Sequence, residues 1–212
     1  MIIPVRVFAQ MVCEVGKFAS ADVKLPVFGC VQLVLDAGGF RVGATDRYTI
    51  GRLTRRREWE GDDLGESWSV LVPRESWKRI LRVFSPRSEW DRWLDMVTII
   101  PVDGPQLSLE TRLSTGQDFG LRVPLYEDTT FRYPDLGTLI HQQDEDAGLT
   151  EVYIKPAFLK RLPNRMFGLS VAMAPGGPET GRVVRVCELP YDAGGNPDLA
   201  FDGAIMSLRR DS

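Results

Sequence analysis

The sequence predicts an α+β protein built from three successive units, each with a strand and a helix followed by three further strands. Two observations support this prediction. Runs rich in β-branched residues alternate with a few stretches of helical periodicity. In addition, the runs that begin at Val70 and at Val152 share one order, which is a strand, a proline, and a helix with a Lys-Arg pair. The unit from Val5 repeats this order without the matching proline.

In the first unit, apolar residues at spacings of three and four predict a helix over residues 8–19. Gly38 and Gly39 supply the positive-φ turn of a β-hairpin. The β-branched content predicts three strands, over residues 28–35, 40–44 and 48–57. An acidic loop over residues 60–66 then ends the unit.

In the second unit, a strand over residues 67–73 ends on a proline, and a helix over residues 74–84 follows it. Residues 87–94 form a Trp-rich insertion to which the pattern assigns no structure. Three strands are predicted next, over residues 96–102, 106–113 and 119–126. Residues 131–136 read as an extended, proline-bearing segment.

The third unit follows a predicted linker over residues 141–149. Its helix is short because Pro163 ends it. The predicted elements are a strand over 152–156, the helix over 157–162, and strands over 169–174, 182–189 and 201–209. The predicted organisation is a full domain over 1–140, made of units 1–66 and 67–140, then the linker, then a half-domain over 150–212.

Length and composition bound the class of protein. The chain has 212 residues, 43% hydrophobic and 26% charged, which suffices for one large or two small domains. The net charge of −3 argues against a protein that coats nucleic acid, unless its arginines gather on one face. No apolar run approaches the ~20 residues of a membrane-spanning helix, and no secretory signal is visible. Three cysteines in apolar patterns indicate buried thiols in a reducing compartment, so we expect a cytoplasmic protein without a membrane partner.

Four short segments, spread over most of the length, carry a family resemblance. They are Leu-Pro-Val-Phe-Gly-Cys-Val-Gln-Leu (25–33), Ala-Thr-Asp-Arg-Tyr-Thr-Ile (44–50), Tyr-Pro-Asp-Leu (133–136) and Ala-Ile-Met-Ser-Leu-Arg (204–209). Together they resemble bacterial DNA sliding clamps, the β-type processivity factors of the replicative polymerase. The resemblance implies the DNA clamp architecture, with three half-domain units where the family has three full domains.

The chain departs from the family pattern at three positions. The second segment resembles Ala-Thr-Asp-x-x-Arg-Leu in the middle domain of a clamp, with Thr49 at the arginine position. At the C-terminal end, Ser207 replaces a proline and Arg210 replaces the final leucine.

The predicted helices carry repeated cations. They are Lys17, Arg74, Lys78, Arg79, Arg82, Lys155, Lys160, Arg161 and Arg165. The helices of a sliding clamp line its central hole, so the resemblance implies that these side chains contact phosphates of duplex DNA without reading bases. The alternative is that they are ordinary solvated cations of exposed helix faces.

The resemblance also implies a groove that binds short linear motifs of partner proteins. The matching positions are Thr45, Tyr48, Ile50, Pro134, Leu139, Ala204 and Met206. A shallow apolar groove with a methionine accepts varied apolar anchors. The alternative is that these residues complete the core at the strand ends.

No residues show the spacing of a catalytic or metal site. The single histidine, His141, lies in a polar stretch, and Asp46, Asp62, Asp63 and Asp103 are scattered acids in turns. No Gly-rich phosphate loop opens a helix. We therefore expect no enzyme activity, no metal and no cofactor.

The leading prediction is a clamp-like processivity or tethering factor. It would encircle duplex DNA as a homo-oligomer and hold a DNA polymerase or another clamp-binding protein through the groove. The alternative is a clamp-derived interaction module that does not encircle DNA and binds or sequesters a partner.

Overall fold

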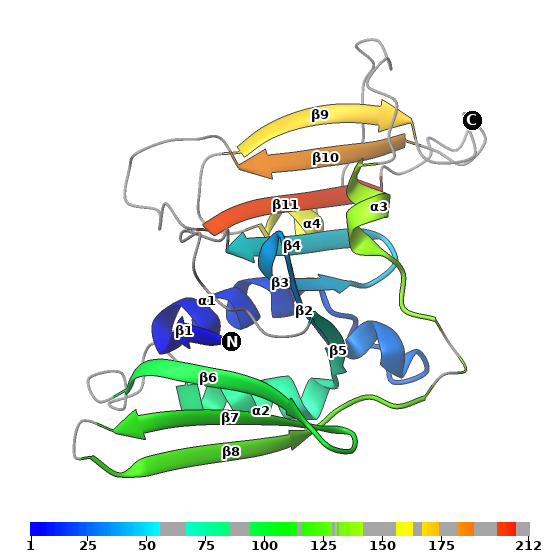
Figure 1. Ribbon diagram of the computed structural model, residues 1–212. Helices are drawn as coiled ribbons and strands as arrows, with labels where there is room; N and C mark the ends of the chain where they lie inside the picture. Colours follow the sequence, from blue (N-terminus) through cyan, green and yellow to red (C-terminus); the bar gives the residue numbers. More distant parts are fainter. Residues whose placement is uncertain are drawn as a thin grey trace.

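The computed structural model describes most of the chain. The described residues are 1–55, 67–84, 94–113, 116–128, 130, 132–141, 156–162, 167–173, 182–188 and 199–206. Their strands form two antiparallel sheets, one of four strands and one of seven, with helices packed against them (Figure 1). The predicted α+β class is confirmed.

The four-stranded sheet has the order β1-β6-β7-β8, and each neighbouring pair is antiparallel. Its strands are β1 (Ile2–Pro4), β6 (Leu94–Val102), β7 (Gln106–Leu113) and β8 (Asp118–Pro124). The seven-stranded sheet has the order β5-β2-β3-β4-β11-β10-β9. Its strands are β5 (Trp68–Val72), β2 (Val31–Asp36), β3 (Gly39–Thr45), β4 (Thr49–Arg55), β11 (Leu199–Met206), β10 (Arg182–Glu188) and β9 (Phe167–Met173).

Two first strands cross between the sheets. β1 directly precedes α1 (Val5–Val15), yet it pairs with β6, which follows α2 (Arg74–Phe84). Conversely, β5 directly precedes α2, yet it pairs with β2, which follows α1. The two segments therefore exchange their first strands, and this exchange joins them into one packed body.

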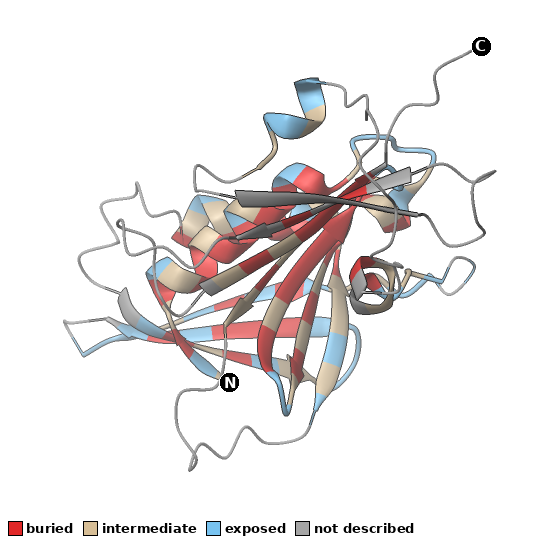
Figure 2. Cartoon of the chain, turned by 90° about the horizontal axis from the view of Figure 1, so that it is seen from above, coloured by how far each residue is buried: buried red, intermediate tan, exposed pale blue. Residues whose placement is uncertain are grey.

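The helices bury their apolar stripes against both sheets. α1 contacts α2, β3 and β6, so it lies between the two sheets (Figure 1). The 3-10 turn η1 (Gly16–Phe18) extends α1, and a second 3-10 turn, η2 (Pro26–Gly29), precedes β2. The indole N–H of Trp77 in α2 donates to the carbonyl of Gly29 at 3.0 Å. Buried residues of the helices and strands gather in the middle of the molecule (Figure 2).

The C-terminal part joins the same large sheet. β4 pairs with β11 over seven positions, from Leu199 opposite Arg55 to Ile205 opposite Thr49. Val184 and Val186 of β10 and Phe201 and Ile205 of β11 belong to the same apolar core as α1. The division into a domain over 1–140 and a half-domain over 150–212 stays a prediction.

Most predicted elements are confirmed, with shifted ends. The helix over 74–84 has the predicted bounds. The helix predicted over 8–19 begins at Val5, which is buried and directly follows the extended Pro4 at the end of β1. The strand predicted from residue 28 begins at Val31, because Pro26–Gly29 forms a 3-10 turn. Of the two glycines predicted to supply the positive-φ hairpin turn, Gly39 does so with φ 112°, whereas Gly38 does not.

The prediction of an extended segment over 131–136 is wrong at its C-terminal end, because α3 (Leu136–His141) begins at residue 136. The carboxylate of Asp135 accepts hydrogen bonds from the Thr138 backbone N–H at 3.1 Å and from the Thr138 hydroxyl at 2.8 Å. This is the capping arrangement of a helix N-terminus. His141, predicted to open the linker, is the last residue of α3.

The predictions on several stretches lie outside the described residues. They concern the loop 60–66, most of the insertion 87–94, the linker residues 142–149 and the strand residues 152–155. Pro156, predicted to end that strand, begins α4 (Pro156–Leu159).

Candidate partner groove and nucleic-acid interface

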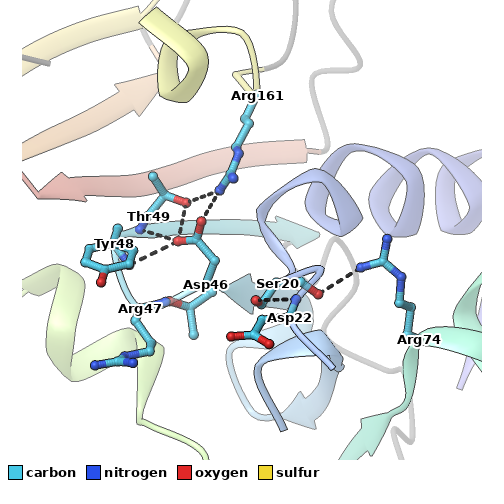
Figure 3. Close-up of polar contacts among 9 residues, drawn as sticks. Ser20, Asp22, Asp46, Arg47, Tyr48, Thr49, Arg74 and Arg161 are labelled. Atoms are coloured by element: carbon cyan, nitrogen blue, oxygen red, sulfur yellow. Dashed lines mark hydrogen bonds and ion pairs between the residues drawn. The ribbon is translucent and has the colours of Figure 1, made fainter. Parts of the chain in front are cut away.

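The turn between β3 and β4 is organised by the carboxylate of Asp46. It accepts hydrogen bonds from the backbone N–H groups of Tyr48 at 3.0 Å and Thr49 at 2.8 Å, and from the Thr49 hydroxyl at 2.9 Å (Figure 3). The Arg47 N–H donates to the Thr45 hydroxyl at 3.1 Å, and Arg47 has the left-handed φ of 82°. Such Asx turns are a local property of aspartate. The turn projects Tyr48, which is 53% exposed, with the Arg47 guanidinium 5.9 Å from its ring centre.

Arg161, just after α4, ties the C-terminal segment to this turn. Its guanidinium forms an ion pair with Asp46 and donates to the Thr49 hydroxyl at 2.8 Å (Figure 3). The Asp46 side chain is only 10% exposed and that of Arg161 28% exposed. The guanidinium also lies 5.4 Å from the ring centre of Phe158. We call the contacts of Arg161 with Asp46 and Thr49 the turn latch.

Beside the turn lies a small apolar cluster, separate from the main core. It consists of Ile50, Leu136, Ile140 and Ala204, with Tyr133 and Leu139 packed against it. Ile50 and Ala204 are direct cross-strand partners where β4 meets β11. α3 places Leu136 and Ile140 over this junction. Burial raises the pKa of the Tyr133 phenol above its ordinary value, so this side chain is neutral.

Most of the predicted groove residues adjoin this junction. Thr45 ends β3, Tyr48 lies in the β3–β4 turn, and Ile50 lies near the start of β4, opposite Ala204. Pro134 and Leu139 come from the segment that leads into and forms α3, and Met206 ends β11. Ile50 and Ala204 are buried, because Leu136 and Ile140 cover them. Leu136 and Ile140 are not among the predicted groove residues, because two apolar residues in a helix of only six do not make a periodic pattern that stands out.

A cavity of about 510 Å³ opens next to the cluster. It lies between α3 with its preceding segment and one face of the large sheet, at the strands β5, β2, β3 and β4. Of the predicted groove residues, only Pro134 lines it. Its walls are polar and include Gln32, Arg41, Arg52, Arg132 and Asp135. Arg41 forms an ion pair with Asp36, and Arg52 pairs with Asp202 at 3.1 Å. Burial, followed by the charge of Arg52, lowers the pKa of Arg41.

The predicted phosphate-contacting residues divide into three groups. Lys17, Arg79, Arg82 and Lys160 are exposed, and Lys78 is half-buried. Two others have protein partners, because Arg74 donates to the Ser20 carbonyl at 2.8 Å and Arg161 belongs to the turn latch (Figure 3). Lys155 and Arg165 lie outside the described residues.

Two of these cations directly follow residues of the contact between α1 and α2. A Cβ at Gly16 would lie 3.1 Å from the Trp77 ring, so the end of α1 packs closely on α2. Lys17 follows Gly16, and Lys78 follows Trp77. Arg79 instead lines a hollow of about 1030 Å³ along the four-stranded sheet, together with Arg112 and Arg122. Arg112 and Arg122 lie on strands of the four-stranded sheet and are not among the predicted phosphate-contacting residues.

Among the described residues, no group of three or more His, Cys, Asp or Glu side chains is placed to hold a metal ion. None of their helices has the length and apolar character needed to cross a membrane.

Comparisons with known proteins agree on the fold. No protein-family model and no curated protein matches the chain. Solved structures do match it. The β chain of DNA polymerase III from Streptococcus pneumoniae is similar with a TM-score of 0.64 and 14% identity, over 99% of this chain and 64% of that chain.

Two further structures give the same result. The β subunit of DNA polymerase III from Thermotoga maritima matches with a TM-score of 0.64 and 14% identity, over 99% of this chain and 65% of that one. The DNA polymerase sliding clamp of Bacillus subtilis matches with a TM-score of 0.61 and 13% identity, over 99% and 64%. The chain therefore has the fold of bacterial DNA sliding clamps and spans slightly less than two thirds of their length.

Proposed function

We propose that the protein is a clamp-like tether that encircles duplex DNA as a homo-oligomer and holds a partner protein through a linear motif. The observation that carries this proposal is the sliding-clamp fold over 99% of the chain. The exposed cations Lys17 and Arg82, with half-buried Lys78, support DNA contact by the α1–α2 pair. Such contacts supply charge without base-reading geometry, which is what sliding on DNA requires.

Charge reversal tests the DNA contact. The triple variant Lys17→Glu, Lys78→Glu, Arg82→Glu should bind duplex DNA at least tenfold more weakly. The slope of log affinity against log salt should also fall by about one for each lost phosphate contact. Fluorescence anisotropy with a labelled duplex at several salt concentrations measures both quantities.

The matched control is Arg112→Glu, Arg122→Glu, which reverses two exposed cations of β7 and β8. We expect this variant to retain most of the affinity. Equal losses in the two variants would show that binding follows net charge alone, and the helix interface would then be wrong. Arg161 is unsuitable for such a test, because its reversal would also break the turn latch.

Encirclement is tested by topology. A closed ring should stay on circular duplex DNA at high salt and leave it when the DNA is cut once. Gel filtration of the complex before and after cutting measures the retained fraction. Retention that does not change on cutting would contradict encirclement.

The groove is tested by truncating two of its predicted residues that are not fully buried. Tyr48→Ala, with Leu139→Ala as a second variant, should weaken binding of a labelled peptide with leucine and phenylalanine anchors by about tenfold each. Tyr48 is exposed and Leu139 half-buried, so truncation there costs little folding energy. Val23→Ala, at an exposed loop position, is the control. If the peptide binds all three variants as tightly as the original protein, the groove does not lie here.

The second candidate function is an interaction module that uses the groove without encircling DNA. The exposed Tyr48 beside the apolar cluster of Ile50, Leu136, Ile140 and Ala204 supports this alternative, because a groove at this place does not require a closed ring. Peptide binding without topological retention would support it.

A further inference from the structure

The cavity of about 510 Å³ beside α3 has a wall rich in cations, and we call it the arginine cavity. Three of its lining residues are arginines, Arg41, Arg52 and Arg132, whereas Asp135 is the only acidic residue described there. Both carboxylate oxygens of Asp135 already accept hydrogen bonds from Thr138, at 3.1 and 2.8 Å. Each guanidinium carries five N–H donors and no acceptor, so the charged groups of the wall are mostly donors.

Two of the arginines are held in place by acids outside the wall. Arg41 pairs with Asp36, and Arg52 pairs with Asp202 at 3.1 Å. Neither aspartate lines the cavity. Arg132 is exposed and forms no ion pair with any other described residue. The wall therefore combines two positioned guanidiniums with a third that is available to a ligand.

The positive charges of the wall act on each other. Burial, followed by the charge of Arg52, lowers the pKa of Arg41, although the Asp135 carboxylate has the opposite effect. An opposite charge within about 4–6 Å favours the charged form of such a group, so a bound carboxylate would offset this repulsion. Tyr133 is a further lining residue, and its buried hydroxyl donates to no acceptor among the described residues. An oxyanion is the kind of ligand that such a wall accommodates.

The arginine cavity is continuous with the apolar cluster of the predicted groove. In the sheet, Gly43 lies opposite Arg52 of β4 and two residues after Arg41 of β3, on the same face. A Cβ at Gly43 would lie 2.6 Å from Cδ1 of Leu136, so the missing side chain lets α3 approach the strand there. Leu136 is at once a member of the apolar cluster and a lining residue of the cavity, and Pro134 of the predicted groove also lines it. The cavity and the groove therefore share part of their walls.

We propose that the arginine cavity is an acid-binding subsite of the partner groove, which takes aspartate or glutamate side chains of the partner's linear motif. The inference rests on the proposed function, because one peptide occupies both places. Arginine suits this role, since its planar N–H donors match the two oxygens of a carboxylate. The volume falls within the range of ordinary ligand pockets, which is ample for one or two acidic side chains.

The shared wall favours a peptide over a free anion as the occupant. A small anion such as phosphate would gain only the contacts to the guanidiniums. A peptide gains those contacts and, through its neighbouring anchors, burial against Leu136 and Pro134. The cavity would also select among motifs, because a neutral side chain there leaves the guanidiniums without a carboxylate.

Matched peptides test the preference. All carry the leucine and phenylalanine anchors, with two glutamates before them, two glutamates after them, or glutamines at the same places. We expect at least one acidic peptide to bind about fivefold more tightly than its glutamine counterpart. Raising the salt concentration should reduce this preference, because Arg132 is exposed and its charge is screened. Fluorescence anisotropy of the labelled peptides measures the dissociation constants.

One substitution separates the cavity from a general effect of charge. Arg132→Gln should abolish most of the preference and leave the affinity for the glutamine peptide unchanged, because an exposed side chain contributes little to folding. Arg122→Gln is the matched control, which removes an exposed cation from β8 and should retain the whole preference. A similar loss in both variants would mean that acidic peptides respond to net charge alone, and the proposal would be overturned.

The other outcomes distinguish failure of the subsite from failure of the groove. Equal binding of the acidic and glutamine peptides overturns the subsite and leaves the groove intact. Binding of none of the peptides contradicts the groove itself, and the subsite with it. Calorimetry with inorganic phosphate alone adds a further outcome. If phosphate binds and the protein has no preference among the peptides, the cavity is a free-anion site and the proposal is wrong.

Discussion

Replacing Asp46 by alanine is expected to lower the free energy of unfolding by about 3 kcal/mol. The substitution removes the acceptor of two backbone N–H groups and of the Thr49 hydroxyl. It also leaves the Arg161 guanidinium without its carboxylate in a largely buried place. The loss should exceed that of a surface turn, because breaking one partner of a desolvated ion pair leaves the other charge uncompensated.

Urea denaturation measures this loss of stability and the share of it that depends on the ion pair. The proteins compared are the original chain, Asp46→Ala, Arg161→Met and the double variant. The cycle should show a coupling energy of at least about 1 kcal/mol between the two residues. Asp22→Ala is the matched control, because the Asp22 carboxylate accepts from the Lys24 backbone N–H at 2.9 Å in an exposed turn. It should cost about 0.5 kcal/mol. A cost for Asp46→Ala no larger than this control would mean that the turn latch contributes nothing to stability.

The turn latch joins two residues that are far apart in the sequence. The guanidinium that pairs with Asp46 comes from Arg161, 115 residues further along the chain. A sequence reading sees Arg161 as half of an exposed Lys-Arg pair, and the helical pattern of residues 157–162 gives no sign of its distant partner.

The elements that the sequence predicted well have strong local signals. α2 has apolar residues at helical spacing and a proline before it, and the hairpin at Gly39 has its glycine at positive φ. α3 has only six residues, too short for a periodic pattern to stand out. It is stabilised by the Asp135 cap and by burial of Leu136 and Ile140 against β4 and β11. Those contacts are tertiary, so the segment could be recognised as helical only with the sheet in place.

The same reasoning applies to the exchange of β1 and β5. Each run reads as a strand from its own residues, but nothing local says which sheet it joins. Register and partner depend on where α1 and α2 pack. The repeat in the sequence therefore predicted the kinds of element and their order, whereas the crossed pairing emerged only from the structure.

Gly51→Ala is expected to cost about 3 kcal/mol of stability, because β4 passes directly against the ring of Phe18. A Cβ at Gly51 would lie 2.3 Å from Cδ2, 2.5 Å from Cε2 and 2.7 Å from Cγ of this ring. Phe18 is fully buried and packs on Phe201, with ring centres 5.8 Å apart. The ring therefore has no open space into which to move, and either η1 or the strand must shift.

Gly43→Ala is the matched control, one strand away in β3. Its Cβ would lie 2.6 Å from the terminal methyl Cδ1 of Leu136, with every other neighbour at 3.8 Å or more. A leucine methyl can rotate aside, so we expect a loss of about 1 kcal/mol. Thermal and urea unfolding compare the two variants, and Phe18→Leu should recover part of the stability of Gly51→Ala by removing the clash. Equal costs at the two glycines, or no recovery by Phe18→Leu, would show that contact with this ring does not require glycine at position 51.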